Sequence, residues 1–187
     1  LWLPKAGGGD IRWLESGAEL EKVLDRGGVA YMNLPRLYHG IASRASVERI
    51  FQTFGRFVPG SSPDMALSVA LALTNRRYLS VDYPVTVFGA SRNSGGGRTA
   101  ASRHYGRIED QKHLPRDIAA RWDPRLPMIW SEQIIYPQTI HEVMSLSRTD
   151  GSISYSALYA SLIAYEPQVF QHLMPVLANY IAEDARR

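Results

Sequence analysis

Several stretches in the first half of the chain place apolar residues at the three- and four-residue spacing that is typical of helices. Gly17–Arg26 is amphipathic and is followed by a glycine pair suited to a helix end. Val47–Phe54 keeps its apolar residues on one face, with Ser46 as the expected N-cap and Gly55 as a left-handed C-cap. Met65–Asn75 is apolar on nearly every side, which predicts a buried helix.

Strand patterns are shorter. Val29–Leu34 is a brief apolar run, and Leu37–Ala42 continues in an extended style. Tyr78–Gly89 alternates for much of its length, and Pro84 within it requires a bend or an edge position. Because helix patterns lead into strand patterns, the sequence predicts an α/β fold.

The last third of the chain is helical in pattern. The expected helices are Gln138–Leu146, Ser154–Tyr165 and Gln168–Ala182. Pro167 suits the first turn of the last of these helices, whereas Pro175 lies inside it and predicts a kink or a break.

Composition changes this picture little. The chain has 187 residues, of which 45% are hydrophobic and 21% charged, so it is long and apolar enough for one globular domain. The net charge of +3 is not gathered into a basic stripe, and nucleic acid is therefore not an expected partner. The absence of cysteine excludes disulfides, thiolate catalysis and cysteine zinc sites.

Most familiar catalytic signatures are missing. No Walker-type phosphate loop, HExxH or GxSxG motif occurs. The histidines are scattered, and none is paired at the spacing of metal ligands, which argues against a site made of histidines alone. A Ser–His–Asp triad stays open because its members need not be close in sequence, but nothing nominates one.

One loop carries a candidate for chemistry. After the Gly55 turn, a loop with glycine and proline leads to Asp64, which stands where the buried helix begins. A carboxylate there gains from the helix dipole and from free backbone N–H groups, which predicts a lowered pKa and an ionised side chain at neutral pH. An ordinary helix cap explains the same local pattern.

The order of these pieces resembles the second half of the catalytic domain of glycosyltransferase family 2, of the GT-A type. In that family a Gly-x-Phe turn is followed, after a short loop, by an acidic motif that opens a helix. The resemblance covers Tyr31 to Tyr105, and its flanking pieces look like those of members that assemble bacterial polysaccharides. The matching pieces are Gly55-Arg56-Phe57 and Ser62-Pro63-Asp64, and the flanking pieces are Leu34-Pro35, Tyr38-His39-Gly40, Asp82-Tyr83-Pro84 and Gly89-Ala90-Ser91-Arg92-Asn93-Ser94.

The resemblance implies inverting transfer of a sugar from a nucleotide-diphospho-sugar to a saccharide or lipid-linked acceptor. Asp64 would be the general base that takes the proton of the acceptor hydroxyl. The glycine-rich loop Ser91–Arg103 would form a lid over the diphosphate. The residues that would bind substrate are His39, Ser62, Arg92, Ser94 and His104.

Each of these assignments has a structural alternative. His39 fits a buried strand histidine with a satisfied hydrogen bond, and the glycine-rich loop fits a solvated surface loop. The region of Trp122 and Trp130 could stack on a sugar, although core packing is the commoner role for tryptophan.

The chain departs from the family in two respects, since the metal-binding motif and the nucleotide-binding strands expected before it are both missing. The family holds a divalent metal, Mg²⁺ or Mn²⁺, and the sugar diphosphate with an Asp-x-Asp motif, and no such motif occurs here. We therefore expect an α/β fragment, in which 1–105 is the acceptor-side part of a GT-A-like domain and 106–187 a mainly helical extension. The metal ligands would lie mostly outside this chain, and the resemblance implies a cytoplasmic location, with the inner face of the membrane as an option.

Two other classes of function stay open. The chain could be a non-catalytic interaction or oligomerisation module that uses the helices of Ser154–Ile181. It could also bind a membrane surface peripherally, although those helices lack a basic polar face.

The missing motif generates a first prediction. Because the donor-binding half is expected elsewhere, the purified 187-residue chain should neither hydrolyse nor transfer sugar from UDP-, GDP- or dTDP-sugars. Turnover of any of these donors by the chain alone, measured by release of the nucleotide, would contradict the expectation that it is only half of a transferase.

Overall fold

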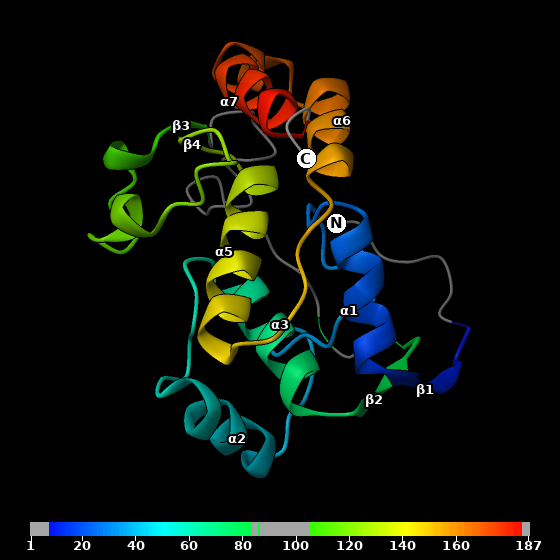
Figure 1. Cartoon of the computed structure of the whole chain (residues 1–187). Helices are drawn as coiled ribbons and strands as arrows, with labels where there is room; N and C mark the ends of the chain where they lie inside the picture. The colour runs from blue at the N-terminus through cyan, green and yellow to red at the C-terminus, as the bar shows by residue number, and fades with distance from the viewer. Residues whose placement is uncertain (1–7, 84–85, 87–104, 185–187) are drawn as a thin grey trace.

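The computed structural model describes residues 8–83, 86 and 105–184, which form a mixed structure of helices and short strands (Figure 1). Helix α5 runs through the middle, with α6 and α7 at one end and α2 at the other (Figure 1). Helix α3 packs against α5, α2 and α1. The helices are α1 (Ser16–Asp25), α2 (Arg44–Phe54), α3 (Pro63–Thr74), α5 (Glu132–Ser147), α6 (Tyr155–Tyr165) and α7 (Phe170–Asp184), with short 3-10 turns at Ile108–Asp110, Ile118–Arg121 and Pro167–Val169.

The strands form small antiparallel pairs. β1 (Ile11–Glu15) pairs with β2 (Arg77–Val81), and β3 (Gly106–Arg107) pairs with β4 (Ile129–Trp130). The sequence-based expectation of a fold that mixes helices and strands is confirmed at that level. The finer expectation of half a GT-A domain, and the division at residue 105, stay predictions.

Helix α1 forms where the sequence predicts it. Its buried residues, Ser16, Glu19, Leu20 and Val23, follow one face at helical spacing. The helix ends at the glycine pair, where both residues have positive φ. Gly27 also has no room for a side chain, because a Cβ there would lie 2.5 Å from the backbone nitrogen of Leu158 in α6.

Helix α3 is the buried helix that its composition predicts. Every residue from Met65 to Ala72 is buried, so the helix packs against neighbours on all sides. Helix α2 also forms and ends at Gly55 in the left-handed conformation, as expected. The predicted N-cap, Ser46, was wrong, because the helix begins about one turn earlier. Ser43 is the N-cap and accepts a hydrogen bond from the Ser46 backbone N–H, whereas the Ser46 hydroxyl donates to Asn75.

The extended segment before α2 is not a strand. The expected strand Val29–Leu34 contains a turn at Met32, with φ of 48°, and the Leu34 N–H bonds back to the carbonyl of Tyr31. Leu37–Ala42 likewise forms bends and turns. The short apolar run folds onto the core as a loop, where Leu34 is buried, rather than pairing in a sheet.

The first sheet also differs from expectation. Within the described part of Tyr78–Gly89, strand structure ends at Val81, and its partner β1 follows directly on the glycine-rich amino-terminal segment. Most of the remainder of that expected strand, with Pro84, and the whole loop Ser91–Arg103 lie outside the described residues.

The carboxy-terminal helices are confirmed with adjusted bounds. α5 begins six residues before the expected Gln138 and includes Pro137. Ser154 caps α6, and Pro167 opens a 3-10 turn that leads into α7, which continues through Pro175 without a break. Among the described helices, none combines the length and the apolar character required to span a membrane.

Candidate functional site

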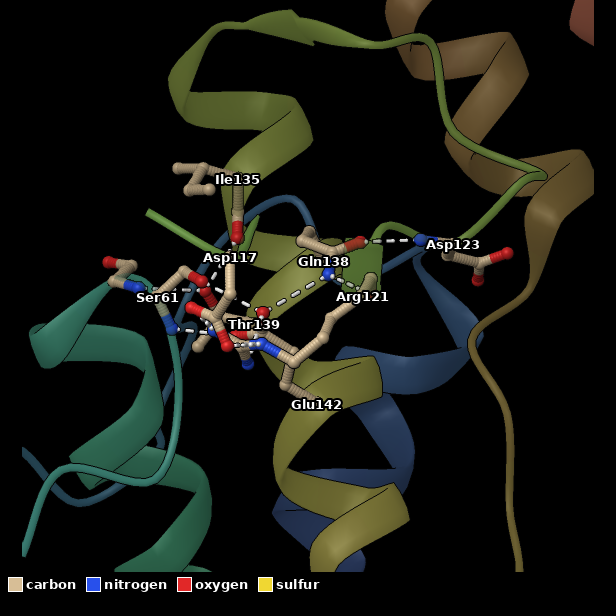
Figure 2. A network of polar contacts seen from close by, with 9 residues as sticks. Ser61, Asp117, Arg121, Asp123, Ile135, Gln138, Thr139 and Glu142 are labelled. Carbon is tan, nitrogen blue, oxygen red and sulfur yellow. Dashed lines mark hydrogen bonds and ion pairs between the residues drawn. The ribbon is translucent and has the colours of Figure 1, made fainter. Parts of the chain in front are cut away.

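The loop that precedes Asp64 is attached to α5 by buried polar contacts (Figure 2). The Ser61 backbone N–H and hydroxyl donate to the two carboxylate oxygens of Glu142, at 2.7 and 2.8 Å. The next N–H, of Ser62, donates to the Thr139 hydroxyl at 2.9 Å. Gly60 allows this approach because a Cβ there would lie 2.7 Å from the Thr139 methyl group.

Glu142 itself is fully satisfied although it is buried. Arg121 donates to it at 3.1 Å and is held in turn by Asp117, while Gln138 donates to it at 3.2 Å and to the Arg121 carbonyl (Figure 2). A buried carboxylate is tolerated only with such partners. The network therefore fixes the loop, and with it the first turn of α3, on the side of α5.

A second buried carboxylate, Asp123, is equally saturated. Arg125 donates to it with two nitrogens at 3.0 Å, and the Tyr155 hydroxyl also donates to it. Burial opposes ionisation, but these donors outweigh it and lower the pKa of Asp123. The Asp123 backbone N–H bonds to Gln138, which joins this cluster to the Glu142 network. Both clusters stabilise the fold around α5.

A cavity of about 640 Å³ opens between the first turns of α3 and α5. Each helix contributes one carboxylate to its wall, Asp64 from α3 and Glu132 from α5. The rest of the wall is mainly aromatic and hydroxyl-bearing, with two histidines and one arginine. The other polar and aromatic lining residues are Tyr31, Arg36, Tyr38, His39, Ser61, Ser62, Ser68, Thr86, His113, Trp130 and Tyr136.

The electrostatics of Asp64 differ from the sequence-based prediction. Burial by the surrounding walls raises the pKa of this carboxyl, and Glu132 adds to the rise. The His39 charge and the hydroxyls of Tyr31 and Tyr38 oppose it without cancelling it. The prediction of a lowered pKa was therefore wrong, because desolvation outweighs the helix terminus. Asp64 is also not the cap: Ser62 is the N-cap, and Asp64 stands in the first turn.

The tyrosines of the cavity are kept neutral. Burial and a 2.6 Å hydrogen bond to Glu132 raise the pKa of Tyr136 far above its usual range. Burial also raises the pKa of Tyr31 and of Tyr38. The rings of Tyr31 and Tyr136 lie 4.8 Å apart, so one aromatic pair spans the cavity wall. These side chains present hydroxyl groups rather than phenolates to a ligand.

Three predicted site residues meet in this cavity. Asp64, Ser62 and His39 all line it. The alternative for His39, a buried strand histidine, is wrong, since the residue is exposed and lies in a turn. Trp122 and Trp130 are both buried in the core, and Trp130 also lines the cavity. The other predicted substrate residues, Arg92, Ser94 and His104, lie outside the described residues.

Sequence reasoning missed the contribution of α5 to the cavity. Glu132 and Tyr136 are one helical turn apart and face the same space, but their helix was expected to begin only at Gln138. Tyr31 was not predicted to line a site, because it lies in Val29–Leu34, which was expected to be a strand. The i, i+4 spacing of Glu132 and Tyr136 was the one available signal.

The divalent metal that the resemblance implies, with ligands expected mostly outside this chain, stays a prediction. Among the described residues, no group of three or more His, Cys, Asp or Glu side chains is placed to hold an ion. No step can be assigned to a metal on these residues.

No protein-family model matches the sequence, and neither the curated proteins nor the solved structures include a significant match. The residues that bear on function are therefore those of the cavity and of the motifs that line it.

The network beneath the loop generates a prediction about stability. Glu142→Gln replaces one acceptor oxygen with an NH2 group, which cannot accept from the Ser61 or Arg121 donor that faces it, and removes the charge that pairs with Arg121. We expect a loss of about 2 to 3 kcal/mol in the free energy of unfolding, measured by urea denaturation at neutral pH. Hydrogen exchange at the Ser61 and Ser62 amides should accelerate at the same time.

Glu109→Gln is the matched control, because Glu109 also pairs with an arginine, Arg107, but at an exposed site. It should leave the unfolding curve unchanged. An equal loss in both variants, or unchanged amide exchange in Glu142→Gln, would show that the loop does not depend on this carboxylate.

Proposed function

We propose that the chain is the acceptor side of an inverting glycosyltransferase, with Asp64 as the general base. The observation that carries the proposal is the position of Asp64. The residue at the end of the Ser62-Pro63-Asp64 motif lines a 640 Å³ cavity together with His39 and Ser62, the other described residues that the resemblance nominated.

The raised pKa of Asp64 supports this role. A general base works best when its pKa approaches the working pH, and desolvation moves this carboxyl in that direction. The Asp64 side chain stands at the exposed rim of the cavity, so an acceptor hydroxyl can reach it. It would take the proton of that hydroxyl while the oxygen attacks the anomeric carbon of the donor.

The walls of the cavity suit a saccharide. Aromatic faces such as those of Tyr38 and Trp130 can cover the C–H face of a sugar ring, and carboxylate and hydroxyl groups can bond its rim. The donor nucleotide sugar, and a metal if one is used, would be held by groups outside the described residues.

A second function, a protein-interaction module, is favoured by one surface on α7. Phe170, Met174 and Ile181 are 49%, 44% and 58% exposed, and their spacing places them on one face of the helix. The adjacent face, with Leu173 and Tyr180, packs on the core. An apolar stripe of this kind on a helix is a common contact for a partner or a second copy.

The proposal predicts that Asp64→Asn abolishes turnover without abolishing donor binding. In a protein that carries the donor-binding half, kcat should fall about 10²- to 10⁴-fold, the usual contribution of a general base. The Kd for the nucleotide sugar, measured by calorimetry, should change little. In the wild type, kcat/KM should decline as the pH falls through the raised pKa of Asp64.

Stability gives an independent readout of the same variant. Because the folded-state pKa of Asp64 is raised, its ionised form is less stable in the folded chain than in the unfolded one. Asp64→Asn should therefore be at least as stable as the wild type at neutral pH, and any gain should vanish at pH values below the ordinary pKa of aspartate. Asp110→Asn, at an exposed site that does not line the cavity, is the control.

Equal turnover by wild type and Asp64→Asn would exclude Asp64 as the base.

The interaction module predicts self-association through the α7 stripe. If a second copy covers it, sedimentation should detect a dimer that Met174→Glu dissociates while the far-ultraviolet circular dichroism stays unchanged. Gln171→Glu places the same charge on an exposed neighbouring position and should not change the oligomeric state. A monomer at all concentrations would leave the stripe without this role.

A further inference from the structure

The hydroxyl of Tyr31 is a buried polar group that makes no hydrogen bond of normal geometry among the described residues, although Tyr136 and Asp64 lie close enough to influence it. Buried tyrosine hydroxyls usually find a partner, because an unsatisfied one costs free energy. The hydroxyls of Ser16 and Ser131 are also buried and unpaired, but neither residue lines the cavity. Tyr31 differs because it belongs to the cavity wall that holds Asp64.

The ring of Tyr31 is fixed by packing around it. The Tyr136 ring packs against it with 4.8 Å between centroids, and the Arg36 guanidinium lies 5.2 Å above it. Tyr136 is itself held by its hydrogen bond to Glu132. The direction of the Tyr31 hydroxyl is therefore set before any ligand arrives, which is the arrangement that specific recognition uses.

The Tyr31 hydroxyl also lies near the Asp64 carboxylate. The two groups interact closely enough for Tyr31 to influence the ionisation of Asp64. The Tyr31 hydroxyl makes no hydrogen bond of normal geometry, so it keeps capacity for a ligand group, and the exposed Asp64 carboxylate stays accessible beside it and the Tyr38 hydroxyl. A carboxylate accepts a proton from one hydroxyl, and a neutral phenol donates to another. Two neighbouring hydroxyls of one sugar ring satisfy both groups at once.

We propose that Tyr31 selects acceptors with a vicinal diol: the reacting hydroxyl donates to Asp64, and the adjacent hydroxyl accepts from Tyr31. This inference rests on the proposed function and adds the recognition element to it. In this assignment the second sugar hydroxyl is the hydrogen-bond partner that the Tyr31 hydroxyl lacks. The neutral state of the phenol makes it a donor at this position.

Tyr31→Phe tests the assignment, because it removes only the oxygen atom. The probes are the methyl glycosides of glucose, galactose and mannose, with binding to the chain followed by the amide NMR signals of cavity residues. For the glycoside that binds, Tyr31→Phe should raise the Kd about three- to tenfold. Its thermal unfolding midpoint should stay equal or rise, since an unsatisfied buried group has been removed.

Tyr136→Phe is the matched control for a structural hydroxyl, since its oxygen bonds Glu132 and its loss should lower the unfolding midpoint. Monodeoxy versions of the bound glycoside complete the test. In the wild type, removal of the hydroxyl next to the reacting one should weaken binding, and in Tyr31→Phe the same removal should cost nothing further.

The possible outcomes test saccharide binding by the cavity and the role of Tyr31 separately. If no glycoside binds the wild-type chain, the proposed function fails, and the assignment of Tyr31 fails with it. If the wild type binds and Tyr31→Phe binds equally well, the saccharide cavity stands and the role of Tyr31 is overturned. A fall in the unfolding midpoint of Tyr31→Phe without a change in Kd would also overturn it, because the hydroxyl would then be structural.

Discussion

The pair of hydrogen bonds from Ser61 to the buried Glu142 carboxylate is the contact on which the geometry of the cavity depends. It joins residues 81 positions apart in sequence and attaches the loop before α3 to the middle of α5. Asp64 follows three residues after Ser61, and Glu132 lies on the same helix as Glu142, so one contact sets the spacing of both cavity carboxylates. A buried carboxylate would destabilise the fold by several kcal/mol if it lacked partners. Here Ser61, Arg121 and Gln138 all donate to it, and the anchor is compatible with a stable core.

Asp64 illustrates which of two opposed effects is larger. A helix N-terminus stabilises a nearby carboxylate by roughly 0.3 to 1 kcal/mol and so lowers its pKa. Desolvation can raise a pKa by several units when walls close around the group. The walls here come from segments far from α3 in sequence, including Tyr31 and Glu132, and burial is the larger influence on Asp64. The result is a carboxyl with a raised pKa in the wall of a cavity lined by aromatic and hydroxyl-bearing residues, which a local view of the helix start does not predict.

The sequence predicts what local patterns determine. The stripe of α1, the uniform apolarity of α3 and the Gly55 cap are all encoded within a few residues, and they were predicted correctly. Asp64, Ser62 and His39 were nominated by motif and do share a cavity. Contacts that depend on tertiary packing were not predictable. Met32 turns the chain where a strand was expected, and the contribution of Glu132 and Tyr136 requires knowledge of where α5 begins. The predicted direction of the Asp64 pKa shift was wrong for the same reason, because the burial of this carboxyl depends on the assembled cavity walls.

Buried polar groups in this fold differ in whether they have hydrogen-bond partners, and this difference bears on the role of the cavity. Asp123 and Glu142 are as buried as any charged group described, and donors surround both. The chain can therefore satisfy buried polar groups where stability requires it. In the cavity it leaves the Tyr31 hydroxyl unpaired and the Asp64 carboxyl partly desolvated. Natural sequences depart from full satisfaction mainly at functional sites, where a ligand supplies the missing partner. The Tyr31 hydroxyl, unpaired in a cavity wall that also carries the Asp64 carboxyl, is thus a physical reason to examine this cavity as a binding site.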